Sequence, residues 1–306
     1  MESSEKLLVG ENLKDKTELK ILHITDLHTD KHGMDKMLQF KEKVKEESIY
    51  YDIILISGDM QSYMMKDWED PMICTKALQE ITSILTYAHS ICPNVYYIPG
   101  NHDPPDLFCC DDTPRPSLIN LEPDMQTIQF QLKENCENIH GRIVEVCKGL
   151  KIAGFGGSKD NIIVEDGKDV DTIWEPYPYK DEEEFSTCLN ALIKNLKKQQ
   201  EEEDFQTILM THIGPRSSES TIDREFCDNE IHMGSESIED CMKDQEGKIL
   251  CNIHGHSHES AKNTEVHSIP VINSNAFFLG QYGEIYFKKN STTEKWELED
   301  IKFKEF

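Results

Sequence analysis

The stretch Gly100-Asn101-His102-Asp103 decides the fold class of this chain. It follows a short apolar run of strand type, Val95-Tyr96-Tyr97-Ile98, and is followed by two prolines. In open α/β sheets, ligands bind beyond the carboxyl ends of the strands, so a polar turn there can present an amide, an imidazole and a carboxylate to one point. Taken alone, the tetrapeptide is equally well explained as a surface turn, because Gly-Asn is common turn chemistry.

Four other strand-like runs end in a similar way. The polar residues that follow them are Asp26-Leu27-His28 after residues 19–25, Gly58-Asp59 after 51–57, His212 after 205–211, and His254-Gly255-His256-Ser257-His258 after 248–253. Together with Asn101 they offer oxygen and nitrogen donors of the kind that bind manganese, iron or zinc. Five such strand ends in order are difficult to explain by chance, so the sequence predicts a metal site at the edge of a sheet.

In order and spacing, these segments resemble the signature of the calcineurin-like metallophosphoesterases, which is D-x-H, GD, GNH(D/E), H and GHxH. The resemblance covers residues 20 to about 260. It implies an α/β fold in which a two-sheet β-sandwich is flanked by helices, in four layers α/β/β/α, with a dinuclear metal site at the strand ends. It also implies hydrolysis of a phosphate ester, but it leaves the substrate open because the superfamily is chemically broad.

The resemblance assigns roles to the motif residues. One metal would be held by Asp26, His28, Asp59 and His258, and the other by Asp59, Asn101, His212 and His256. Two divalent ions (Mn, Fe or Zn) about 3.5 to 4 Å apart would provide a nucleophile near neutral pH and compensate phosphoryl charge, and a hydroxide between them would attack phosphorus. His102 would protonate the leaving oxygen or stabilise the transition state, and Asp103 would support the site from outside the ligand set.

Some of these residues also have a structural explanation. Asp26 and Asp59 each follow a strand and could precede a helix, and considered alone they would be explained best as helix N-caps. His254 lies two residues before His256, and we interpret it as structural because the resemblance assigns the metals to the two histidines after the glycine. The other histidines match no motif position and are expected in the core or on the surface: His23, His32, His89, His140, His232 and His267.

The rest of the chain alternates between helix and strand patterns, which favours a layered α/β sheet. Apolar residues at helical spacing predict helices over residues 33–47, 74–91 and 185–196. A continuous apolar run at 53–56 predicts a strand covered on both faces. The pattern at 142–155 predicts a hairpin, which the resemblance places in the second sheet. Strands predicted at 271–273, 284–287 and 296–303 would complete that sheet.

The chain length is sufficient for one large domain with a substantial core. We expect residues 1–18 to form a flexible or edge arm and residues 19–306 to form a single domain. Periodicity disappears near residues 158–184, where we expect a loop insertion that acts as a substrate lid, although a loop held by its own aromatics is the commoner case. Trp174, Tyr177 and Tyr179 from this insertion could stack on a nucleobase, and Arg216 could reach a phosphate.

Composition restricts the partners. Lys+Arg 32 against Asp+Glu 58 gives a net charge of -26, which argues against nucleic acid and anionic membranes and leaves a small phosphorylated substrate. The chain starts without a secretory pattern and contains no apolar run of membrane-spanning length. None of its ten cysteines forms a C-x-x-C pair. We therefore expect a cytoplasmic enzyme with reduced thiols; the sequence does not predict its oligomeric state.

Departures from particular relatives narrow the function. Protein serine/threonine phosphatases continue the second motif as GD-x-V-D-R, whereas Gly58-Asp59 is followed here by Met60-Gln61-Ser62-Tyr63. Purple acid phosphatases place a ligand tyrosine where this chain has Ser62. The acidic balance argues against the DNA-repair nucleases.

Two interpretations stay open. The first is a hydrolase of a small phosphodiester, phosphomonoester or nucleotide-type pyrophosphate, which the intact His102 and ligand set favour. The second is a non-catalytic protein-binding scaffold on the same fold, as in the retromer subunit that resembles this family but has lost key histidines.

Overall fold

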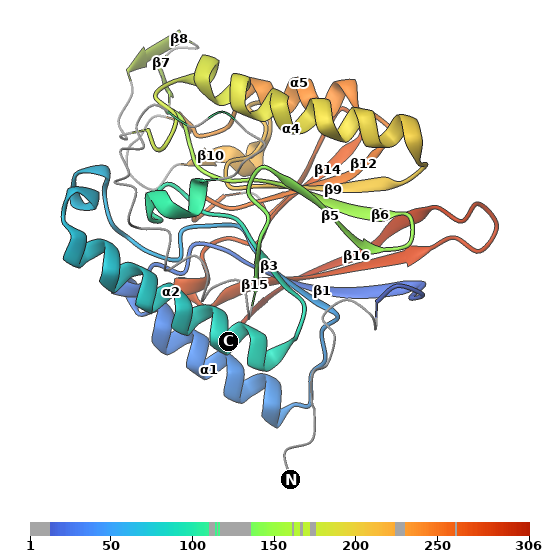
Figure 1. The fold of residues 1–306 in the computed structure, drawn as a ribbon, viewed down its shortest axis with the longest axis horizontal. Coiled ribbons are helices and arrows are strands. Elements are labelled where there is room, and N and C mark those ends of the chain that lie inside the picture. The colour runs from blue at the N-terminus through green and yellow to red at the C-terminus, as the bar shows by residue number, and fades with distance from the viewer. Residues whose placement is uncertain are drawn as a thin grey trace.

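A computed structural model of the chain describes residues 13–109, 114, 116, 136–160, 162–165, 168–171, 176–223, 230–260 and 262–306. Within these residues, two six-stranded sheets lie face to face between two layers of helices (Figure 1). Helices α1 (Gly33–Glu46) and α2 (Pro71–Ile91) cover the first sheet, and α4 (Glu182–Glu202) and α5 (Glu236–Asp244) cover the second. The predicted four-layer sandwich is therefore confirmed.

The first sheet combines parallel strands with an antiparallel hairpin. Its strands in spatial order are β16 (Trp296–Glu305), β15 (Gln281–Lys289), β1 (Glu18–Ile24), β2 (Ile53–Ile56), β3 (Val95–Tyr97) and β4 (Glu137–Asn138). β15 pairs antiparallel with β1, with Leu19 opposite Phe287. The expectation that residues 284–287 and 296–303 complete the second sheet is therefore wrong. Their alternating pattern identifies them as strands, but it contains nothing that selects the neighbouring strand.

The second sheet contains the predicted hairpin. Its strands in spatial order are β13 (Asn263–Val266), β14 (Ile269–Asn273), β12 (Ile249–His254), β9 (Gln206–Thr211), β6 (Leu150–Phe155) and β5 (Arg142–Cys147). β5 and β6 pair antiparallel, whereas β14, β12, β9 and β6 run parallel. The predictions for residues 142–155 and 271–273 are confirmed.

The apolar run of β2 is buried on both of its faces. Ile54 and Ile56 pack with the core between the first sheet and its helices, whereas Ile53 and Leu55 pack with the core between the two sheets. This period of two explains why the strand has no polar position. Because β1, β2 and β3 are parallel, the carboxyl ends of all three strands lie at the same edge of the sheet.

Helices α2 and α4 begin after aspartates whose side chains accept one of the first N–H groups. The Asp70 carboxylate accepts the N–H of Met72 at 2.8 Å, and Pro71 occupies the first position of α2. The Asp181 carboxylate accepts the N–H of Glu184 at 2.9 Å in α4. The helices predicted over 33–47, 74–91 and 185–196 are confirmed, and α4 extends beyond the predicted limits. None of the described helices is long and apolar enough to cross a membrane.

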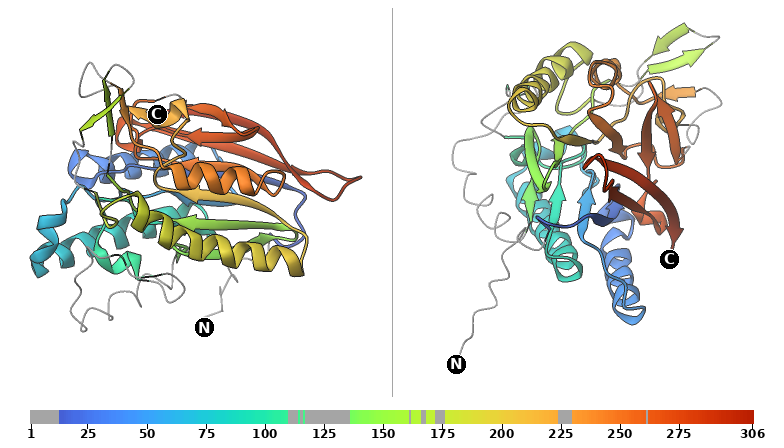
Figure 2. Two further views of the ribbon diagram at one scale, coloured as in Figure 1. Left: turned by 90° about the horizontal axis from the view of Figure 1, so that it is seen from above. Right: turned by 90° about the vertical axis from the view of Figure 1, so that its right-hand side faces the viewer.

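The insertion at residues 158–184 contains a hairpin. In the part that the structure describes, β7 (Ile162–Glu165) and β8 (Lys168–Asp171) join β11 (Glu230–His232) and β10 (Ile222–Asp223) in a small separate sheet (Figure 2). Strands this short carry too few positions to show a period of two, which is why the sequence predicted only a loop. Of the N-terminal arm, Leu13 is buried between the sheets and Lys16 pairs with Asp52; residues 1–12 lie outside the described residues.

A buried carboxylate joins the strands of the first sheet away from the polar loops. Glu284 is 1% exposed and accepts hydrogen bonds from the Tyr51 and Tyr286 hydroxyls at 2.9 and 2.7 Å. The ammonium groups of Lys20 and Lys304 both lie 2.9 Å away. Burial alone would raise the pKa of Glu284, but these partners outweigh it and lower the pKa to about 2.

We expect Glu284→Gln to lower the free energy of unfolding by about 1.5–3 kcal/mol at neutral pH, because charged hydrogen bonds are lost. Since the folded-state pKa is lowered, the carboxylate stabilises the protein above its ordinary pKa near 4.5 and loses this effect as the pH falls toward about 2. The difference in the free energy of unfolding between variant and wild type, measured with urea, should therefore become smaller as the pH falls from about 4.5 toward 2. Glu299→Gln, at an exposed position of the same sheet, is the control and should change stability by less than about 0.5 kcal/mol. An equal effect of both variants would contradict the account.

Candidate metal centre

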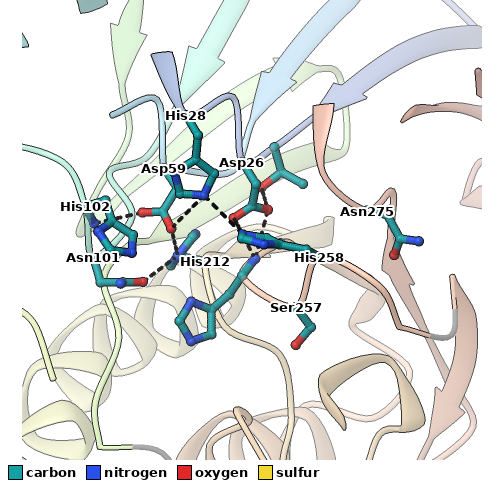
Figure 3. Close-up of polar contacts among 12 residues, drawn as sticks. Asp26, His28, Asp59, Asn101, His102, His212, Ser257, His258 and Asn275 are labelled. Atoms are coloured by element: carbon teal, nitrogen blue, oxygen red, sulfur yellow. Dashed lines mark hydrogen bonds and ion pairs between the residues drawn. The ribbon is translucent and has the colours of Figure 1, made fainter. Parts of the chain in front are cut away.

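The loops that follow five strands from both sheets meet at one edge of the sandwich (Figure 3). The backbone of Asp26 donates to Gly58, and that of Gly255 donates to His212. The approach is so close that a Cβ atom on Gly100 would lie 2.1 Å from Oδ1 of Asp59, and one on Gly255 would lie 1.9 Å from Oγ1 of Thr25. The motif glycines are therefore required by the contact between loops.

Several of the polar residues in these loops have a strained backbone. The φ angles of Asp26, His28, Asp59 and His256 are 51°, 46°, 49° and 69°, which is the left-handed region. Non-glycine residues rarely adopt it, and each such residue costs on the order of 1–3 kcal/mol unless the surroundings enforce it. Such strain concentrates at functional sites, and here it turns consecutive polar side chains toward one point.

The side chains form two donor groups, and Asp59 of the second group also faces the first. The groups are Asp26, His28 and His258, and Asp59, His212 and His256, with the donor atoms of each group within 4.8 Å of one another. Oδ2 of Asp59 lies 3.3 Å from Nε2 of His212 and 3.9 Å from Nε2 of His28, so it stands between the groups (Figure 3). Oδ1 of Asn101 lies 2.9 Å from Nε2 of His212. The structure brings all seven predicted ligands together in the predicted division; their role as ligands stays a prediction.

Hydrogen bonds orient the imidazoles toward the shared space. Nδ1 of His212 donates to the carbonyl of Ser57 at 2.8 Å, which leaves its Nε2 to face Asp59. Nδ1 of His28 donates to the Ser62 hydroxyl at 3.0 Å, and Ser62 in turn donates to Asp30. Nε2 of His28 therefore carries a lone pair, and it accepts a hydrogen bond from Nε2 of His258 at 3.1 Å. A bond to the second ring nitrogen is typical of metal-binding histidines.

The electrostatics of the cluster also fit a cation. Burial would raise the pKa of Asp59, but His212 and neighbouring imidazoles hold it well below its usual value. Burial would lower the pKa of His212, but Asp59 raises it to about 9. Burial keeps His28 neutral, with a pKa of about 3. Nε2 of His256 is buried without a hydrogen-bond partner among the described residues. Carboxylates and neutral imidazoles form a suitable donor set for Mn, Fe or Zn.

His102 lies beside this cluster and is only half-buried. Its backbone N–H donates to Oδ1 of Asp59 at 2.8 Å, and its ring centre lies 5.4 Å from that of His28. Nδ1 donates to the carbonyl of Tyr63 at 2.8 Å, because a carbonyl only accepts. This contact holds Nδ1 and leaves Nε2 as the ring nitrogen that can take up and release a proton.

Asp103 holds two motif loops together. Its carboxylate accepts the N–H of Gly100 at 2.8 Å and that of Gln61 at 3.0 Å. Burial raises its pKa to about 7. Asp103 thus acts on the backbone of the GD and GNHD turns, outside the two donor groups.

Two of the residues predicted to contact the substrate are buried in the core. The side chains of Tyr177 and Tyr179 are 3% and 1% exposed, because they pack in aromatic clusters with Phe108 and Phe155. The interpretation of these tyrosines as stacking residues is therefore corrected to a core role. Trp174 lies outside the described residues. The Arg216 guanidinium lies 3.6 Å from the Glu236 carboxylate, and its role toward a phosphate stays a prediction.

The sequence analysis missed Ser62, Asp30 and Phe278. The first two orient His28, and the half-buried Phe278 ring packs edge-on against His28 and His258 at 5.5 and 5.3 Å. For Ser62 there was a signal, because it occupies the position of a ligand tyrosine in purple acid phosphatases. Asp30 and Phe278 belong to no motif, so no pattern could have singled them out.

Comparison with solved structures shows the fold. A dimetal phosphatase from Danio rerio aligns with a TM-score of 0.54 and 10% identity, covering 94% of this chain and 95% of that one. The calcineurin-like phosphoesterase YfkN from Bacillus subtilis aligns with a TM-score of 0.51 and 13% identity, covering 94% and 90%. The protein TT1561 of Thermus thermophilus aligns with a TM-score of 0.53 and 15% identity, covering 94% and 99%.

Sequence comparison shows the family. A search of curated proteins gives no significant match. The family model described as calcineurin-like phosphoesterase matches residues 19–260, which contain all five motif segments. The chain therefore belongs to the calcineurin-like phosphoesterase family and is a metal-dependent phosphoesterase.

Proposed function

We propose that the protein hydrolyses a small-molecule phosphodiester, phosphomonoester or nucleotide-type pyrophosphate with two divalent ions. The observation that carries this proposal is the position of Asp59. One oxygen of its carboxylate stands between the two donor groups, and the other accepts the backbone N–H of His102. A shared carboxylate with a proton-exchanging histidine beside it is the arrangement that two-metal hydrolysis requires.

The residues would bind the two ions in two sets. Asp26, His28 and His258 would hold one ion, Asn101, His212 and His256 the other, and Asp59 both. When bound, the ions activate water and compensate charge on the phosphoryl oxygens. The buried carboxylates and neutral imidazoles keep the donor atoms deprotonated or readily deprotonated, which favours Mn, Fe or Zn.

His102 would take up a proton on Nε2 to form the imidazolium and give this proton to the leaving oxygen. Its Nδ1 is anchored to the Tyr63 carbonyl, so Nε2 is the nitrogen that can carry the exchanged proton. The anchor is a neutral carbonyl and not a carboxylate. It therefore fixes the orientation of the ring without adding a negative charge close to an anionic substrate.

Charge and thiol chemistry support our proposals for the partner and the compartment. A net charge of -26 supports a small phosphorylated substrate over nucleic acid or an anionic membrane surface. The eight cysteines in the described part of the chain are free thiols, and seven of them are buried. This supports a reducing compartment, and we place the enzyme in the cytoplasm.

We expect metal-stripped protein to hydrolyse bis-p-nitrophenyl phosphate or p-nitrophenyl phosphate only after Mn²⁺, Zn²⁺ or Fe²⁺ is restored. His102→Ala should lower kcat by about 10²–10⁴-fold because proton transfer is lost. Its Mn²⁺ affinity should stay within about threefold of wild type, since its side chain lies outside both donor groups. Steady-state kinetics with both esters, beside a Mn²⁺ titration, measure these effects. Metal-independent turnover, or full activity of His102→Ala, would reject the proposed mechanism.

We expect Asp59→Asn to reduce Mn²⁺ binding from two ions to at most one, because an amide cannot bridge two cations as a carboxylate does. Equilibrium dialysis with elemental analysis measures the stoichiometry. Asp52→Asn is the matched control, because Asp52 is also a buried aspartate next to β2, but it pairs with Lys16 and the N–H of Lys20. It should retain two ions. Two ions bound to Asp59→Asn would contradict the shared carboxylate.

A further inference from the structure

His254 fills the space between the two loops that supply the ligands of the second sheet. It is the last residue of β12, it is fully buried, and it immediately precedes the Gly255-His256-Ser257-His258 turn. Its ring lies against Gly214 in the loop that follows His212, where an added Cβ atom would come within 2.7 Å of the imidazole. The ring thus touches both loops and is not a member of either donor group.

A chain of hydrogen bonds passes through this ring. Nδ1 of His254 must donate to the carbonyl of Gly255 at 2.9 Å, because that oxygen only accepts. Nε2 of His254 lies 2.7 Å from the Ser220 hydroxyl. That hydroxyl lies 2.7 Å from the Ser218 hydroxyl, which lies 2.5 Å from the Thr264 hydroxyl on β13. The ring is therefore held through both of its nitrogens.

This series of hydrogen bonds ends at the Gly255-His256-Ser257-His258 turn. The carbonyl of Gly255 is held by His254, while its N–H donates to the carbonyl of His212 at 2.9 Å. The next N–H, that of His256, donates to the Asp26 carboxylate at 3.0 Å. The two peptide groups at the start of the turn are therefore fixed from both sheets before the imidazoles of His256 and His258 begin.

We propose that His254, locked by Ser220, is a positioning residue that sets the His256 and His258 imidazoles against Asp26 and Asp59 and thereby determines metal affinity. The proposal rests on the metal centre of the proposed function and deepens it. Hydrogen-bonding partners of this kind typically change metal affinity by about 10–100-fold when they are removed. His254→Leu keeps an apolar side chain of similar volume but removes both bonds of the ring. Ser220→Ala removes only the hydroxyl that holds Nε2.

The test is a Mn²⁺ titration of the metal-stripped full chain, with free Mn²⁺ followed by its EPR signal and thermal unfolding measured on the same samples. We expect His254→Leu and Ser220→Ala to weaken Mn²⁺ binding by about 10–100-fold. Hydrolysis of bis-p-nitrophenyl phosphate by these variants should recover most of the wild-type kcat in excess Mn²⁺, since the catalytic groups are unchanged. If His254→Leu does not fold, Ser220→Ala alone decides the question.

Two variants serve as matched controls. His140→Leu replaces another buried histidine, whose ring contacts Gly156, Phe108 and Phe155. Thr221→Val removes the neighbouring buried hydroxyl, which among the described residues binds the carbonyls of Pro215 and Ser218. Both should keep wild-type Mn²⁺ affinity within about threefold, whatever their effect on Tm.

Wild-type affinity in Ser220→Ala and His254→Leu, or an equal loss in the controls, would overturn the positioning role. A wild-type chain that binds no Mn²⁺ would instead reject the metal centre itself, and with it the proposal. The titration therefore separates the two failures.

Discussion

The position of the Asp59 carboxylate depends on the contact between the two sheets. Asp59 follows β2 of the first sheet, whereas His212, 3.3 Å from its Oδ2, follows β9 of the second. Asp26, His28 and Asn101 also come from the first sheet, and His256 and His258 from the second. Neither sheet alone carries a complete donor group, so the apolar core between the sheets determines whether the groups meet. The site is therefore assembled when the two sheets pack against each other.

Without metal, the site lowers the stability of the folded chain. Four of its residues have left-handed backbones, at on the order of 1–3 kcal/mol each, and its carboxylates are buried among imidazoles. Bound cations would compensate the charge of these carboxylates and stabilise the folded state by mass action. The hydrogen bonds to Ser57, Ser62 and Gly255 hold the histidines and the turn in place, which limits the reorganisation that binding demands.

Sequence reasoning was strongest where a strict local constraint exists. The order and spacing of the five motif segments carried the family resemblance, and that resemblance implied the sandwich and the grouping of the seven donor residues. The structure shows the local constraints behind the motifs: the motif glycines admit no side chain, and β2 is apolar on both faces. Sequence reasoning failed where partners are chosen by three-dimensional packing. The strand pattern of residues 281–289 contains no sign that β15 joins β1, and the aromatic residues Tyr177 and Tyr179 look alike in sequence whether they face a substrate or the core. Asp30 likewise reaches His28 only through Ser62, a contact that no spacing rule describes.

The central claim is that one carboxylate, that of Asp59, serves two metal ions. Anomalous diffraction from crystals of the full chain loaded with Mn²⁺ tests it most directly. The account predicts two anomalous peaks about 3.5–4 Å apart, both within coordination distance of the Asp59 carboxylate, one beside Asp26 and His28 and the other beside His212 and His256. A single peak, or two peaks of which only one touches Asp59, would contradict it.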